Sequence, residues 1–109
     1  MIGNKAAAGW ALALACVAAA AQEVPRQRVA QAEVRVGAQI YEQNCAPCHG
    51  ARLADPQGAF DLRKFPHDQK GRFVNSVTKG KNNMPPWGSL LSPEEIDALW
   101  AYVIAYANP

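Results

Sequence analysis

The stretch Cys45-Ala46-Pro47-Cys48-His49 is the most informative part of this chain. Two thiols three residues apart fall on the same side of one helical turn. In that position each thiol can add across one vinyl group of the same porphyrin, and C-x-x-C-H is the attachment pattern of c-type haem. His49 follows directly, so its imidazole can bind the iron as the proximal axial ligand. The motif therefore predicts a haem c held by Cys45, Cys48 and His49.

A C-x-x-C pair also occurs in zinc sites, in structural disulfides and in thiol-disulfide oxidoreductases. A zinc site would need two further ligands, and beyond the motif residues 22–109 offer only His67 and no other cysteine. A redox-active pair would follow a buried strand, yet the residues before Cys45 contain no run of β-branched side chains. Haem attachment is therefore preferred, and a thiol-disulfide oxidoreductase that uses Cys45 and Cys48 is the alternative.

The N-terminus has the composition of a secretory leader. Residues 1–5 include one lysine, residues 6–21 are small or apolar, and Ala19-Ala20-Ala21 precedes Gln22. The apolar run is too short to span a bilayer, and small residues at its end favour cleavage. We therefore predict that residues 1–21, with Cys16, are a cleaved signal peptide, and that the protein is periplasmic without stable membrane insertion.

The remaining chain is read as a lead-in and one domain. Residues 22–32 carry few apolar side chains in register and are predicted to be a flexible lead-in, and residues 33–109 form the domain. The whole chain has 11 Lys and Arg against 9 Asp and Glu, which gives no indication of nucleic-acid binding. So small a domain commonly needs a cofactor for stability, and a haem would fill that need.

The periodicity of the domain predicts an all-α fold. Val36, Ile40 and Tyr41 recur at helical spacing between residues 33 and 44. A short helix is expected over about residues 68–79, with Gly80 just after its end. Three to four helices are therefore expected around the haem.

The last helix has the clearest beginning. Ser92-Pro93-Glu94-Glu95 supplies an N-cap, a proline at the first helical position and a capping-box glutamate. The apolar face that follows is wide enough to be buried on more than one side, and it contains Ile96, Leu99, Trp100, Val103, Ile104 and Ala107.

Met84 is predicted to be the second axial ligand of the iron. It lies before Pro85-Pro86 in a polar stretch that cannot be helical, which is a poor place for core packing and a good one for presenting a thioether. A His/Met pair raises the reduction potential of haem iron and suits electron transfer. His67 is the competing ligand. If neither residue binds, the open distal side would suit a haem sensor or a peroxidase.

The chain resembles the small class I cytochromes c over residues 33–109. The matching features are Cys45-Ala-Pro-Cys48-His49-Gly50, the Met84-Pro85-Pro86 stretch, and the pairing of Gly37 and Tyr41 in the first helix with Leu99 and Tyr102 in the last. The resemblance implies that the first and last helices cross closely at the glycine. It also implies that Tyr102, Leu99 and Trp87 pack against the haem.

The same resemblance bears on His49 and on function. It implies that His49 donates its second ring proton to a carbonyl in the following loop, for which Asp55–Gly58 is the candidate region. It implies a one-electron carrier rather than an enzyme, with redox proteins as partners. The segments 80–88 and 91–96 are similar to monohaem cytochromes that accept electrons from quinoprotein alcohol dehydrogenases, so we expect electrons to pass from such a dehydrogenase towards a terminal oxidase or another cytochrome.

Residues 63–81 are rich in basic side chains. They carry six cations against Asp68 alone: Arg63, Lys64, Lys70, Arg72, Lys79 and Lys81. These cations could attract an acidic patch on a redox partner, could neutralise haem propionates, or could be an ordinary solvated surface.

Overall fold

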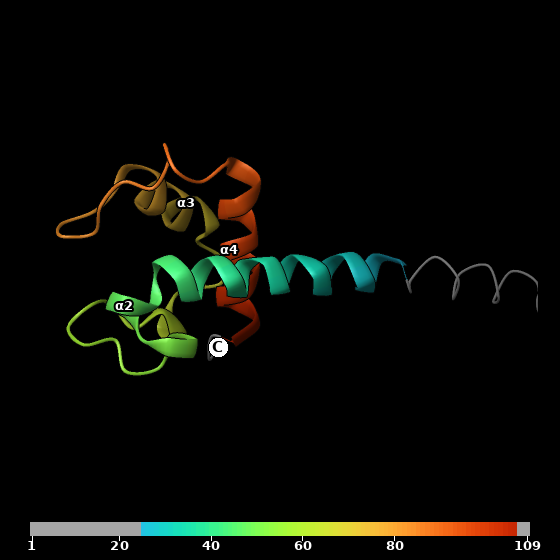
Figure 1. Cartoon of the computed structure of the whole chain (residues 1–109), viewed down its shortest axis with the longest axis horizontal. Helices are drawn as coiled ribbons and strands as arrows, with labels where there is room; N and C mark the ends of the chain where they lie inside the picture. The colour runs from blue at the N-terminus through green and yellow to red at the C-terminus, as the bar shows by residue number, and fades with distance from the viewer. Residues whose placement is uncertain (1–24, 107–109) are drawn as a thin grey trace, which may run out of the picture. The chain divides into compact units, whose positions relative to one another are not determined.

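A computed structural model describes residues 25–106 of the chain. The described residues fall into two units, 25–31 and 32–106, and the predicted signal peptide lies outside them. In the first unit residues 25–31 are helical and exposed. The second unit begins with the helical residues 32–44, called the first helix below. They are followed by α2 (Ala46–His49), η1 (Ala51–Leu53), η2 (Leu62–Lys64), α3 (Lys70–Lys79) and α4 (Pro93–Tyr106). The described part of the chain holds only an isolated bridge between Lys81 and Met84 and no strand, so the predicted all-α class is confirmed (Figure 1).

The helical backbone extends further towards the N-terminus than expected. Residues 25–32 are helical, although the sequence analysis assigned residues 22–32 to a flexible lead-in. Residues 26–32 contain Arg, Gln, Ala and one Val, which are compatible with a helix, and no Gly or Pro interrupts them. The prediction relied on an apolar face, but a run of good helix formers can continue an established helix without one.

The first helix and α4 cross in close contact, as the resemblance implied (Figure 1). A Cβ atom at Gly37 would overlap the backbone carbonyl of Ala98 and would lie 2.9 Å from the Cβ of Tyr102. One turn further on, the rings of Tyr41 and Tyr102 pack with their centroids 5.2 Å apart. Ala98, rather than Leu99, is therefore the residue that meets the glycine.

The helix α4 begins at the predicted capping box. The Oγ of Ser92 accepts from the backbone N–H of Glu95 at 3.1 Å, and a carboxylate oxygen of Glu95 accepts from the N–H of Ser92 at 3.0 Å. The helix is buried on several sides, and its buried residues are Ile96, Ala98, Leu99, Trp100, Tyr102 and Val103. None of the helices in residues 25–106 is both long and apolar enough to cross a membrane.

An aromatic cluster joins α4 to α3 and to the segment before it. The Trp100 ring lies 5.2 Å from the ring of Phe73 and 5.8 Å from that of Phe65, measured between centroids. Phe65 and Phe73 also meet edge to face at 5.7 Å. A salt bridge of 3.1 Å between Lys70 and Asp97 closes the same contact at the surface. This packing fixes α3, from which the Met84 segment departs.

The crossing at Gly37 can be tested by adding a single methyl group. In Gly37→Ala the new Cβ meets backbone atoms of α4, which cannot rotate away, so the helices must separate. Overpacking of this kind costs about 1–3 kcal/mol. We expect the free energy of unfolding of the haem-loaded protein, measured in guanidinium chloride, to fall by that amount.

Gly71→Ala is the matched control. Gly71 lies within α3, and a Cβ atom there would meet nothing within 4 Å. Alanine is favoured over glycine in a helix by roughly 0.5–1 kcal/mol, so this variant should be as stable as the wild type or more so. Equal effects of the two substitutions would contradict a close crossing at Gly37.

Candidate haem-binding site

The C-x-x-C-H residues form a single helical turn. Cys45 is the N-cap of α2, Pro47 lies in its first turn, and His49 is its last residue. The N–H of His49 donates to the carbonyl of Cys45 at 2.9 Å, and the N–H of Cys45 donates to the carbonyl of Tyr41 at 2.8 Å. Both thiols are free; Cys45 is half-buried and Cys48 is exposed. The turn therefore follows the first helix almost directly and has both thiols available for one ligand.

The ring of His49 is oriented by a backbone carbonyl. Its Nδ1 lies 3.0 Å from the carbonyl oxygen of Phe60. Since a carbonyl can only accept, Nδ1 carries the proton, and Nε2 is left with its lone pair for a metal. The prediction that the acceptor lies within Asp55–Gly58 is wrong, because the acceptor is the carbonyl of Phe60, two residues beyond that region.

The loop conformation explains this difference. Residues 57 and 58 form the predicted turn, and the N–H of Ala59 donates to the carbonyl of Pro56 at 2.9 Å. Gln57 and Gly58 both have positive φ angles, 46° and 91°. The chain reverses at this turn, and the carbonyl that contacts the imidazole of His49 is that of Phe60, two residues after the turn.

Tyr41 anchors the other end of the motif, a role that the sequence analysis did not assign to it. Its hydroxyl donates to the carbonyl of Gly50 at 2.6 Å. Burial raises the pKa of this hydroxyl well above its usual range, with smaller contributions from Cys45 and Tyr102, so it remains a donor. Gly50 has a φ of 87°, and a Cβ atom there would overlap the carbonyl of Ala54. The signal in the sequence was an aromatic hydroxyl one helical turn before Cys45.

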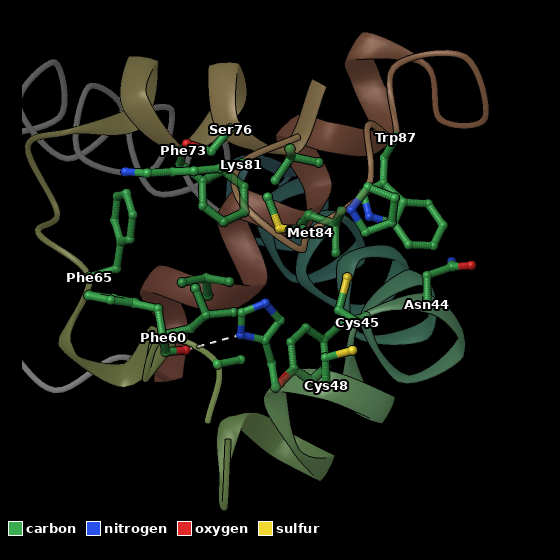
Figure 2. A pocket seen from close by; sticks show the side chains of 18 of the residues that line it. Asn44, Cys45, Cys48, Phe60, Phe65, Phe73, Ser76, Lys81, Met84 and Trp87 are labelled. Atoms are coloured by element: carbon green, nitrogen blue, oxygen red, sulfur yellow. Dashed lines mark hydrogen bonds between the residues drawn. The ribbon is translucent and has the colours of Figure 1, made fainter. Parts of the chain in front are cut away.

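Met84 lies in a segment, residues 81–88, that is fastened at both ends. Lys81 and Met84 exchange two backbone hydrogen bonds, 3.1 and 2.9 Å long, around Asn82, whose φ is 53°. After the two prolines, the N–H of Trp87 donates to the carbonyl of Val77 at 2.8 Å. The segment is therefore held against the last turn of α3. Figure 2 shows the side chains of Met84 and Cys45 pointing into the same space.

These residues surround one cavity of about 830 Å³ (Figure 2). This volume is within the range of cavities that hold a small-molecule cofactor. Most of the predicted site residues line it: Cys45, Cys48, His49, Met84, Trp87 and Leu99. Two residues considered from the sequence do not. His67 lies in an exposed turn away from the lining, and the ring of Tyr102 packs between those of Tyr41 and Tyr106 at the helix crossing.

The chemistry of the thiols argues against a thiol-disulfide oxidoreductase. Burial, with a smaller contribution from the neighbouring Cys48, raises the pKa of the Cys45 thiol to about 11. An attacking cysteine of such an enzyme needs a lowered pKa, which a positive neighbour or a helix N-terminus on a strand-helix unit supplies. In residues 25–106 no strand precedes the pair.

The comparisons with known proteins agree with this geometry. Residues 32–103 match the family described as cytochrome c oxidase, cbb3-type, subunit III. Cytochrome c6 of Microcystis aeruginosa is 40% identical over 77 residues, which are 66% of this chain and 95% of that protein. The chain belongs to the cytochrome c family. Cytochrome c6 of Limnospira maxima is 36% identical over 85 residues, 70% of this chain and 96% of that protein.

A further relative of this cytochrome c is much larger. Quinohemoprotein alcohol dehydrogenase ADH-IIG of Pseudomonas putida is 28% identical over 79 residues, which are 71% of this chain and 11% of that enzyme. The match therefore concerns a small part of the enzyme. The family makes the chain a monohaem electron-transfer protein and confirms haem c as its cofactor.

The residues present fit this cofactor. The two thiols would hold the porphyrin through thioethers, and Nε2 of His49 is available to its iron because Nδ1 is already bonded. When bound, the haem supplies an iron that changes oxidation state by one electron. The protein contributes orientation of the imidazole and a largely apolar enclosure, with Leu62, Phe73, Val77, Leu99 and Val103 among the lining.

The covalent attachment can be tested by mass. We expect intact, denatured protein from the wild type to carry the mass of one haem, and Cys45→Ala and Cys48→Ala each to retain it through one thioether. The Cys45→Ala/Cys48→Ala double variant should lose it, because no thioether can form. Haem mass that survives denaturation of the double variant would contradict attachment through these thiols.

Proposed function

We propose that this cytochrome c is a periplasmic one-electron carrier whose haem iron is bound axially by His49 and Met84. The observation that supports it most is that Met84 and His49 line the same cavity from different segments, one on the segment 81–88 and the other on α2. With both positions filled, the iron has no open position for a substrate. Electron transfer is the chemistry that such a site permits.

The protein's own contacts favour this function. The imidazole of His49 is fixed by the carbonyl of Phe60, and the segment that bears Met84 is fastened to α3 through Trp87. Two rigid supports keep the ligands in place in both oxidation states, so little rearrangement accompanies the transfer of one electron. A thioether opposite an imidazole raises the reduction potential, which suits a carrier that accepts electrons from a dehydrogenase.

Substitution of the methionine tests the ligand set. Met84→Leu keeps an apolar side chain of similar size but removes the sulfur, so the sulfur-to-iron charge-transfer band of the oxidised protein should disappear. The reduction potential should fall, because axial ligands set this potential over a range of roughly 0.8 V. Optical spectra and spectroelectrochemistry measure both effects.

His67→Ala is the control for this variant. His67 lies outside the cavity lining, so its loss should leave the band and the potential unchanged. If Met84→Leu retains the wild-type spectrum, Met84 is not the ligand. An oxidised wild type that has no such band and binds small exogenous ligands rapidly would favour the alternative, a haem sensor or peroxidase with an open distal side.

The cellular location and domain division belong to the same proposal. Residues 1–21 have the composition of a cleaved signal peptide, and residues 33–109 comprise the domain. The family match, which begins at residue 32 and ends at residue 103, supports that division. Thioether formation on the exported side of the membrane is consistent with a periplasmic location.

For the partners we propose a quinoprotein alcohol dehydrogenase as donor and a terminal oxidase as acceptor. Two similar proteins support this proposal. One is the quinohemoprotein alcohol dehydrogenase of Pseudomonas putida, and the other is the cbb3-type cytochrome c oxidase subunit FixP of Sinorhizobium medicae. The latter is 30% identical over 95 residues, 75% of this chain and 33% of that subunit. Each of these two relatives contains a segment similar to this cytochrome, which supports a carrier that exchanges electrons with enzymes of these two kinds.

The basic segment 63–81 supports electrostatic docking only in part. Arg63 is bonded to Asp61 at 3.0 Å and Lys70 to Asp97 at 3.1 Å, so two of its six cations are already paired. The hydrogen bond from Arg63 and its charge lower the pKa of the Asp61 carboxyl, so this carboxylate stays ionised to more acidic pH than a free aspartate. Lys64 and Lys79 are exposed and carry their charge to the surface.

Stopped-flow reduction tests both the donor and the docking. We expect a purified quinoprotein alcohol dehydrogenase, with substrate, to reduce the oxidised cytochrome in a second-order reaction whose rate falls as salt shortens the screening length from about 30 Å at 0.01 M to about 8 Å at 0.15 M. A small neutral reductant is the control and should show no such dependence. No reduction by the enzyme would contradict the donor; reduction at a rate independent of salt would contradict electrostatic docking.

A further inference from the structure

We propose that Arg72 binds a propionate carboxylate of the haem. The inference rests on the haem c that the family carries and is independent of the proposed ligation by Met84. It assigns one specific role to a residue of the basic segment 63–81, whose cations otherwise differ little in the sequence.

The location of Arg72 is the first argument. It lies in the first turn of α3 and lines the cavity, together with Lys81 from the Met84 segment. No Asp or Glu is among the described residues that line this cavity. The wall therefore carries two cations and no carboxylate, and a ligand with carboxylate groups would balance it.

Arg72 is an exposed residue, but two contacts hold its guanidinium in place. Its guanidinium carbon lies 4.6 Å from the centroid of the Phe65 ring, and its Nη1 donates to Oε1 of Gln69 at 2.7 Å. The ring itself is fixed, because Phe65 is buried and packs against Phe73 and Trp100. An arginine that is stacked on a rigid ring loses little further freedom when it binds a carboxylate.

Arg72 also keeps most of its hydrogen-bonding capacity. A guanidinium has five N–H donors, and the Gln69 contact uses one of them. In residues 25–106 the carboxylates that form salt bridges pair with Arg63 and Lys70, not with Arg72. The remaining donors suit a bidentate contact with a carboxylate, a geometry that Lys81 cannot offer.

The titratable and charged groups near Arg72 in the chain come from its own helix and from the two segments before it. The α3 helix contributes Lys70, which is paired with Asp97 of α4, and the exposed turn before it contributes His67 and Asp68. The η2 helix contributes Lys64 and also Arg63, which is paired with its N-cap residue Asp61. The other titratable groups on the lining come from the first helix, α2 and the segment 81–88: Tyr41, Cys45, Cys48, His49 and Lys81.

The test is the pH dependence of the reduction potential. An ionised propionate stabilises the oxidised iron, so the potential falls as pH rises through the propionate pKa. An arginine in contact lowers a carboxyl pKa by about one to three units. We therefore expect Arg72→Gln to move this inflection about one to three pH units upward, as measured by spectroelectrochemistry on haem-loaded protein whose intact mass confirms attachment.

Two controls remove a positive charge elsewhere. Arg35→Gln makes the same substitution on the first helix, and Lys79→Gln changes an exposed residue of α3; neither residue lines the cavity. Both should leave the inflection at its wild-type pH. Arg72→Lys keeps the positive charge but loses the planar, bidentate guanidinium, so it should give a smaller upward shift of the inflection. This variant also tests the proposal if Arg72→Gln does not incorporate haem.

The outcomes separate this inference from the proposed ligation. An inflection in the Arg72 variants that coincides with the wild type, or an equal shift in Lys79→Gln, would overturn the role of Arg72. The charge-transfer band reports on Met84 and should be present in every Arg72 variant. Its absence from the wild type would overturn the ligation and leave the propionate test intact.

Discussion

The close approach of the first helix to α4 is the constraint on which the rest of the site depends. Because residue 37 has no side chain, the backbone of the first helix can contact the carbonyl of Ala98. That contact fixes Tyr41 against Tyr102, and the hydroxyl of Tyr41 then holds the carbonyl of Gly50. The turn that carries both cysteines and His49 is thereby clamped between the helix that precedes it and the residue that follows it.

The two sides of the cavity are supported independently. On one side His49 is oriented by a loop carbonyl, while on the other Met84 depends on hydrogen bonds to the end of α3. The α3 helix in turn rests on α4 through the aromatic rings of Phe73 and Trp100. The helix α4 is thus the shared support, which explains why it is buried on several sides although its N-terminal turn is exposed and acidic.

Features that depend on local chemistry could be predicted from the sequence, and features that depend on loop geometry could not. The C-x-x-C-H turn, the capping box at Ser92 and the end of α3 at Gly80 follow from residue type and spacing. The carbonyl of Phe60 could not be chosen, since positive φ angles at Gln57 and Gly58 decide where the loop returns. The family pattern predicted that Tyr102 lies at the helix crossing. It could not show whether the Tyr102 ring lines the cavity or packs behind Tyr41, as it does in the structure.

The contact between Arg72 and Phe65 is a further feature that the sequence does not reveal and the structure does. The six cations of the basic segment 63–81 look alike in the sequence, but the structure shows that they have different contacts. Arg63 and Lys70 each bind a carboxylate. Arg72 lies over an aromatic ring, and Arg72 and Lys81 line the cavity. A cation bonded to a carboxylate contributes little to the field in the cavity, because the paired charges largely cancel at a distance. The electrostatic environment of the cavity therefore depends more on the cations that line it, Arg72 and Lys81, than on the net charge of the chain.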